Sequence, residues 1–259
     1  MKKLPVFQIT KDAYHFIFTD AKKILPMFVQ YSTSIVLLYV FLHLIKDHFT
    51  FSPTGISRIF SSLAIFTFTT LALWLQLPLN ISVVRTTAIQ EKIGKDYFHL
   101  VLATRTRKAF LTMVITSLLF MMTLVGTAAI IGGLAFAFSP LNLQGISLNI
   151  FNIMLTMFGL IFILYVVLRL FLAIPNASLD NPQPIRLSWR GLKGQLIRLL
   201  VIVILTCLPS IVWSSFVSFL LNVSLDANPL AYGLLNLPQL YLGLILWAGL
   251  GLVYKHLNI

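Results

Sequence analysis

The chain alternates between long apolar stretches and short polar connections that are rich in lysine and arginine. A bilayer core of about 30 Å needs roughly 20 apolar residues per helix, and six stretches are long enough. They lie near 27–45, 59–84, 110–137, 147–174, 196–221 and 231–254. The pattern predicts an all-α, polytopic membrane protein with six transmembrane helices in a single membrane domain, 1–259.

Composition agrees with this pattern and excludes a water-soluble fold. Of the 259 residues, 58% are hydrophobic and only 10% are charged, with a mean hydropathy of +0.93. Soluble domains are about 25% charged, so a soluble fold of this composition would expose large apolar patches and aggregate. The stretch before the first span is mixed rather than apolar. We therefore expect no cleavable signal peptide and predict an N-terminal interfacial segment over 1–26.

The positive charges predict the orientation. All but two of the 19 Lys and Arg residues fall before the first span, in or close to alternate connections, or after the last span. The exceptions, Lys46 and Arg58, lie in the first connection. Because basic loops stay on the cytoplasmic side, we predict a multi-pass protein of the bacterial inner (cytoplasmic) membrane with both termini in the cytoplasm. The net charge of +12 then indicates anionic lipid headgroups as partners and no nucleic acid.

A weak repeat precedes each pair of predicted spans. Basic segments that carry an aromatic residue, Tyr14, Tyr97 or Trp189, occur three times. Apolar residues on such segments can enter the interface while the cations reach lipid phosphates, which predicts short basic interfacial helices. The alternative is that basic flanking segments resemble each other for topological reasons alone. The candidate lipid-headgroup or partner-binding residues are Lys22, Lys23, Arg105, Arg107, Lys108, Arg186, Trp189, Arg190 and Lys193.

One stretch carries a family resemblance. A predicted span ends at Ile174-Pro175, a polar turn with Asp180-Asn181 follows, and a helix containing Ser188-Trp189-Arg190-Gly191-Leu192-Lys193-Gly194 leads into the next span. About thirty residues here resemble YciC-like inner-membrane proteins and the membrane domain of some glycerophosphodiester phosphodiesterases. The segment from Ala13-Tyr14 to Lys22-Lys23 loosely resembles the opening of the same families. The resemblance implies a six-helix membrane domain, and the superfamily has no agreed general activity.

Polar side chains at membrane depth form a second group of candidates. Gln76, Pro78 and Asn80 lie within the second predicted span, and Asn236, Pro238 and Gln239 lie within the sixth. A proline frees a backbone carbonyl, and nearby amides can line a cavity at such a break. Such paired breaks are more often kinks, with the amides binding neighbouring helices together. The alternative is a midplane transport site with these residues lining its cavity.

No motif predicts catalysis, a metal site or a cofactor. The histidines lack metal-ligand spacing, and the carboxylates lie outside the centres of the predicted spans. Asp180 is expected to cap the following helix or to pair with Arg186 or Arg190, and Arg169 is expected to extend to the interface. Ala128, Ala129, Gly132 and Gly133 form small-xxx-small pairs that favour close helix contact.

These observations lead to two functional hypotheses. The first is a non-enzymatic inner-membrane protein that acts through lipids or protein partners, in envelope support or as an accessory subunit. A membrane-protein partner or a homo-oligomer fits this role. The alternative is a transporter or lipid-translocating protein with the midplane amides as its polar site.

Overall fold

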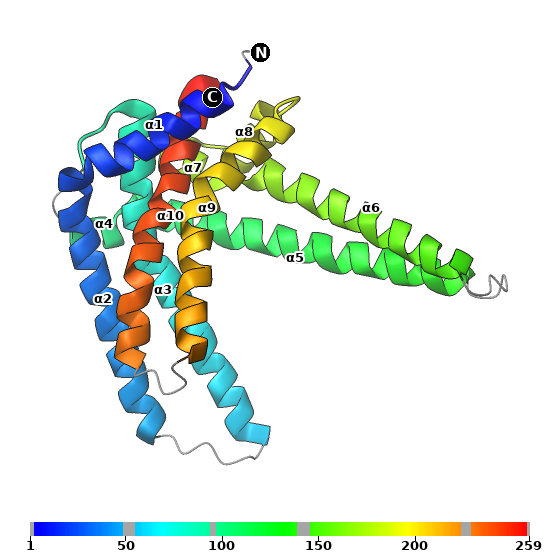
Figure 1. Ribbon diagram of the computed structural model, residues 1–259, viewed down its shortest axis with the longest axis horizontal. Helices are drawn as coiled ribbons and strands as arrows, with labels where there is room; N and C mark the ends of the chain where they lie inside the picture. Colours follow the sequence, from blue (N-terminus) through cyan, green and yellow to red (C-terminus); the bar gives the residue numbers. More distant parts are fainter. Residues whose placement is uncertain (1–2, 49–54, 94–96, 139–145, 224–228, 258–259) are drawn as a thin grey trace.

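The computed structural model describes residues 3–48, 55–93, 97–138, 146–223 and 229–257, and all regular structure in these ranges is α-helical (Figure 1). The all-α prediction is confirmed for this part of the chain. The helices are α1 (Val6–Thr19), α2 (Ala21–His48), α3 (Gly55–Ile89), α4 (Tyr97–Leu102), α5 (Thr104–Phe138), α6 (Ile146–Leu170), α7 (Ala173–Ser178), α8 (Pro184–Gly191), α9 (Leu196–Val223) and α10 (Pro229–Leu257).

Among the described residues, five segments are long and apolar enough to cross a membrane, as a multi-pass protein requires. They are Phe66–Ile89, Thr104–Phe136, Ile153–Ser178, Leu196–Phe219 and Leu237–Leu257. The first predicted span, 27–45, lies within α2, and the side chains of 39–45 lie outside the described residues. The count of six spans therefore stays a prediction.

Four long helices, α2, α3, α9 and α10, lie side by side, and α1 runs across one end of them (Figure 1). Helix α10 packs against α9, α3, α2 and α1. One buried core joins α1, α2, α3 and α10 and includes Met27, Leu79 and Leu244. A second core joins α1, α9 and α10 to the end of α6 through Ile9 and Ile202. The centre of the bundle is thus formed by segments from both ends of the chain.

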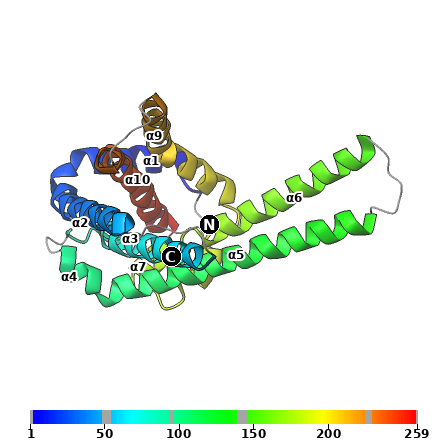
Figure 2. The same ribbon diagram turned by 90° about the horizontal axis from the view of Figure 1, so that it is seen from below.

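The α5–α6 hairpin does not lie along the other long helices. It leaves the bundle and extends to one side in both views (Figures 1 and 2). Gly159 of α6 lies against Thr127 and Ile131 of α5. The predicted small-residue contact differs, because a side chain at Gly132 or Gly133 would meet no atom within 4 Å. The close approach of the two helices therefore uses Gly159 instead.

Two boundaries near the fourth and fifth predicted spans are also different. Helix α6 ends at Leu170, and Pro175 lies in the separate helix α7, in its first turn, where a missing amide donor breaks no helical hydrogen bond. Helix α8 ends at Gly191, so Lys193 and Gly194 lie in a turn before α9. Gly194 has a φ of 74°, a left-handed conformation that glycine adopts without steric cost.

Gly194→Ala should lower the free energy of unfolding by about 1 kcal/mol, because alanine is strained at positive φ. The space around Gly194 is open, so only backbone strain contributes. The measurement is the protection of Cys207, the chain's single cysteine, which is half-buried in α9, against a thiol-reactive dye during denaturation. The matched control is Gly132→Ala, which is also in open space but helical and should be neutral or slightly stabilising. Equal denaturation midpoints for the two variants would show that alanine is not strained at position 194.

Two tyrosines donate to backbone carbonyls close to prolines inside long helices. Pro209 inside α9 cannot donate to the carbonyl of Leu205, and the Tyr14 hydroxyl of α1 donates to that carbonyl at 2.8 Å. The Tyr97 hydroxyl of α4 donates to the Leu75 carbonyl of α3, which is next to the Trp74 carbonyl that Pro78 leaves without a donor. These bonds fasten α1 to α9 and α4 to α3 near the prolines.

The three aromatic residues of the basic segments make related contacts in a cyclic order. Tyr14 of the first segment bonds to the third hairpin (α9), and Tyr97 of the second bonds to the first hairpin (α3). Trp189 of the third lies edge-on to Tyr165 in α6 of the second hairpin, with ring centroids 6.1 Å apart. If each basic segment and the two long helices after it are taken as one unit, the second and third segments contact the helices of the preceding unit. The first segment contacts those of the third unit, which closes the cycle. This arrangement fits a threefold repeat, which the sequence suggested only weakly.

Candidate functional site

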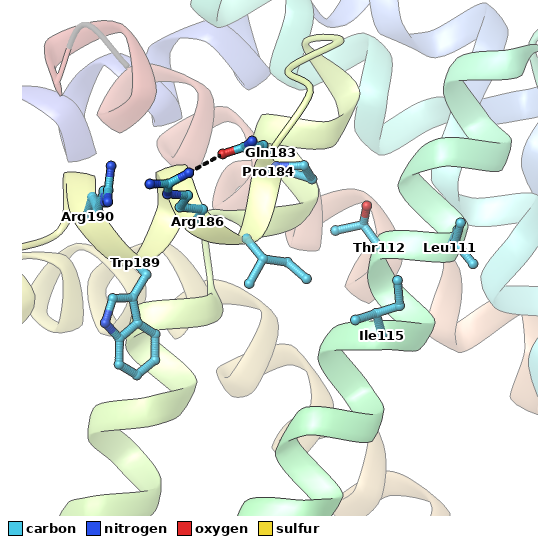
Figure 3. A pocket seen from close by; sticks show the side chains of 9 residues that line it. Leu111, Thr112, Ile115, Gln183, Pro184, Arg186, Trp189 and Arg190 are labelled. Carbon is cyan, nitrogen blue, oxygen red and sulfur yellow. Dashed lines mark hydrogen bonds between the residues drawn. The ribbon is translucent and has the colours of Figure 1, made fainter.

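A groove of about 760 Å³ lies between α8 and the first turns of α5 (Figure 3). Helix α8 begins at Pro184, whose fixed φ favours a first helical position. The spacing i, i+3, i+4 then places Arg186, Trp189 and Arg190 on one face of α8. The lining residues are Leu111, Thr112, Ile115, Gln183, Pro184, Ile185, Arg186, Trp189 and Arg190.

The two walls of this α5–α8 groove differ in polarity. Leu111, Thr112 and Ile115 belong to the candidate span Thr104–Phe136. The α8 wall lies between two candidate spans, outside both. A groove with one wall inside a membrane span and a basic wall outside it matches an amphiphile with an anionic head.

The two arginines of the groove have no acidic partner among the described residues. Arg186 donates from Nη1 to Oε1 of Gln183 at 3.0 Å (Figure 3). Neither Arg186 nor Arg190 forms an ion pair in the part of the chain that the structure describes, and both are exposed. Their positive charge is therefore available to a ligand.

Arg169 of α6 holds α8 in place. It is buried, and its Nη1 donates to the carbonyl of Trp189. Its guanidinium carbon lies 5.2 Å from the Tyr165 ring centroid and 5.5 Å from that of Trp189. The Ser188 hydroxyl donates back to the Arg169 carbonyl at 2.6 Å. Arg169 thus binds α8 instead of extending to the interface, and the i, i+4 spacing of Tyr165 and Arg169 was the available signal.

A second polar cluster joins the ends of α3, α5 and α7. Arg85 of α3 donates from Nε to Oε2 of Glu91 at 2.6 Å, and from Nη1 to the Ser178 carbonyl at 2.7 Å and to Oδ2 of Asp180 at 3.0 Å. Arg105 reaches Oε1 of Glu91 at 3.1 Å and Oδ2 of Asp180 at 3.4 Å. Two cations and two carboxylates therefore alternate in a ring.

Local backbone geometry builds this four-charge ring. Gln90 follows the end of α3 with a φ of 58°, and its amide donates to the Thr86 carbonyl at 3.1 Å. This left-handed cap turns the chain, so that Glu91 returns to Arg85. Asp180 has a φ of 65° after α7. The expectation that Asp180 pairs with Arg186 or Arg190 is wrong, because its carboxylate pairs with Arg85 and Arg105.

The ring shifts the titration of Glu91. Burial raises the pKa of its carboxyl, but the hydrogen bonds and positive charges of Arg85 and Arg105 outweigh burial and hold the pKa below its ordinary value of 4.5. A cavity of about 90 Å³ beside the ring is lined by Arg85, Glu91, Lys92 and Arg105, among others. Since both arginines are already paired with carboxylates, the ring is a tertiary clamp rather than an anion site.

The other basic candidates do not line the groove. Lys23 pairs with Asp20 at 2.7 Å. Lys22, Arg107, Lys108 and Lys193 are exposed. Arg105 belongs to the ring. Of the nine predicted headgroup or partner residues, the structure thus gathers Arg186, Trp189 and Arg190 into one groove.

The predicted midplane residues are not gathered in the three cavities described here. Pro78 lines the small cavity at the ring, whereas Gln76, Asn80, Pro238 and Gln239 line none of the three. Asn80 is buried, and its Oδ1 has no hydrogen-bond partner in the described part of the chain. The Gln239 carbonyl accepts from Ser210 at 3.4 Å. The side chain of Asn236 lies outside the described residues.

Within the described ranges, no three His, Cys, Asp or Glu residues lie close enough together to hold a metal ion. The chain matches no protein-family model, no curated protein and no solved structure.

Proposed function

We propose that this chain is a non-enzymatic protein of the bacterial inner membrane that acts by holding an anionic phospholipid in the α5–α8 groove, with both termini in the cytoplasm. The observation that carries the proposal is the pair of arginines, Arg186 and Arg190, which lack acidic partners among the described residues and line the same groove as the apolar side chains of α5. The roles in envelope support or as an accessory subunit are two ways in which such lipid binding would be used.

The chemistry of the groove supports a phospholipid over a soluble anion. Guanidinium groups bind phosphate oxygens in a planar, bidentate manner, and a tryptophan prefers the level of the headgroups. Leu111 and Ile115 offer no hydrogen bonds, and they suit the glycerol and upper chain region of a lipid. A free phosphate would use the arginines but would leave this apolar wall without a partner.

Replacing both groove arginines, Arg186→Gln with Arg190→Gln, should weaken binding of phosphatidylglycerol about tenfold to thirtyfold. Each cation near the surface contributes about 1 kcal/mol towards an anionic lipid, and tenfold corresponds to about 1.4 kcal/mol. The measurement is native mass spectrometry of protein released from lipid nanodiscs that contain phosphatidylglycerol and phosphatidylcholine.

The matched control removes the same charge from exposed positions outside the groove, Arg107→Gln with Lys108→Gln. We expect the change in the logarithm of the lipid affinity to be less than about half of that in the groove variant, because attraction between the lipid surface and distant charges is screened within a Debye length. Equal losses in the two double variants would show that net charge alone, and no groove, attracts the lipid. Retention of inorganic phosphate instead of lipid would identify a soluble anion as the ligand.

Transport remains the alternative prediction. It needs Gln76, Asn80 and Gln239 to line a common path, and the orphaned Asn80 oxygen is the one feature that favours it. The resemblance to YciC-like inner-membrane proteins fits either role. A stoichiometric protein partner found after mild extraction would favour the accessory role over both.

A further inference from the structure

A second cavity, of about 310 Å³, lies where the α5–α6 hairpin leaves the bundle. Its walls come from the end of α6 and the start of α7, from Thr116, Ser117 and Phe120 of α5, and from Leu246, Trp247 and Leu250 of α10. Every lining residue belongs to one of three candidate spans. If these helices cross the bilayer, the medium around the cavity is hydrocarbon, not water.

We propose that this cavity holds one acyl chain of the phospholipid whose headgroup occupies the α5–α8 groove. The inference rests on the function proposed above and names the part of the ligand that the groove itself leaves outside. The two sites adjoin along α5, since Thr112 lines the groove and Thr116, one turn further on the same side of the helix, lines the cavity. The cavity also extends to Phe120, about 6 Å beyond Thr116 at 1.5 Å per residue.

The lining suits a hydrocarbon chain. The Thr116 hydroxyl donates to the carbonyls of Thr112 and Met113, both at 2.9 Å, so it requires no acceptor from a ligand. Most of the remaining wall is aliphatic or aromatic. The volume is near the lower limit for small-ligand sites and is too small for a helix of about 10 Å diameter. A chain therefore fits where a partner helix does not.

Headgroup and chain have different energetic roles in this arrangement. Moving a chain from lipid to an apolar cavity gains no hydrophobic free energy, because the bilayer is equally apolar. Binding then depends on the arginines, and the cavity only determines where the chain lies. Occupancy of the cavity by an acyl chain should consequently depend on which headgroup the lipid carries. This dependence distinguishes a bound lipid from bulk lipid.

The experiment uses the full chain in phosphatidylcholine vesicles that contain a minor share of lipid with brominated acyl chains, which quench nearby tryptophans. The emission of Trp247 is obtained by subtracting the signal of Trp247→Phe. Brominated phosphatidylglycerol should quench Trp247 at least about threefold more than the same share of brominated phosphatidylcholine. Arg186→Gln with Arg190→Gln should remove this difference.

Ser117→Phe fills the cavity and should also remove the difference, whereas Leu118→Phe, on an exposed neighbouring side chain, should keep it. Ser117→Leu is the milder second variant, and protection of Cys207 reports that each variant is folded. Native mass spectrometry separates the two claims. Two results would overturn the chain site alone. One is selective retention of phosphatidylglycerol without preferential quenching of Trp247, and the other is unchanged quenching in both Ser117 variants. If the wild type retains phosphatidylglycerol no better than phosphatidylcholine, both the proposed function and the chain site are overturned.

Discussion

Arg85→Gln should lower the free energy of unfolding by about 3 kcal/mol. Arg85 is buried and donates hydrogen bonds to Glu91, to Asp180 and to the Ser178 carbonyl. Removing one partner of a buried ion pair costs about 3–5 kcal/mol. We take the lower end because the Glu91 and Asp180 side chains are 39% and 42% exposed, so water compensates part of the loss. The measurement is the denaturant dependence of Cys207 protection.

The control is Arg107→Gln, the same chemical change at an exposed position one turn into α5, which should cost less than about 0.5 kcal/mol. Acidification gives an independent check. Because the folded pKa of Glu91 lies below 4.5, its contribution is complete above that pH and is lost as the pH falls through the folded pKa. The wild type should lose stability below pH 4.5 more steeply than Arg85→Gln. Parallel pH profiles would contradict the role of the ring.

Arg169→Leu should cost about 2 kcal/mol and release α8 from α6. The change removes a charged donor to the Trp189 carbonyl, worth about 1.5–3 kcal/mol, and two cation–π contacts of about 0.5–1 kcal/mol each. It also removes a buried charge without an ion pair among the described residues, which offsets part of the loss.

The measurement is hydrogen exchange of the α8 amides, which should become faster in Arg169→Leu while those of α10 are unchanged. Arg169→Lys is the matched variant. It keeps the charge but loses the planar stacking on Tyr165 and Trp189, so its effect should be intermediate. If the α8 amides of Arg169→Leu exchange at the same rate as in the wild type, Trp189 and Ser188 hold this helix without the arginine.

The candidate groove could be predicted only in part. The sequence named Arg186, Trp189 and Arg190 only among nine basic or aromatic candidates, although their helical spacing would place them on one helix face. The opposite wall, Leu111 and Ile115, lies some 75 positions earlier in the chain. Nothing in an evenly apolar helix identifies which of its sides will face a distant segment. Arg105 belonged to the same group of candidates, and only the backbone turns at Gln90 and Asp180 bring it to carboxylates.

The sequence by itself determined the helical class, the polytopic character and the approximate position of the apolar helices, because backbone polar groups in a bilayer must be satisfied within each helix. Tertiary structure alone decided the direction of the α5–α6 hairpin, the end of α6 before Pro175 and the turn at Gly194. Apolar residues occur on all sides of α5, so no face is specified for packing. Such choices depend on contacts between segments far apart in the chain, which local periodicity does not record.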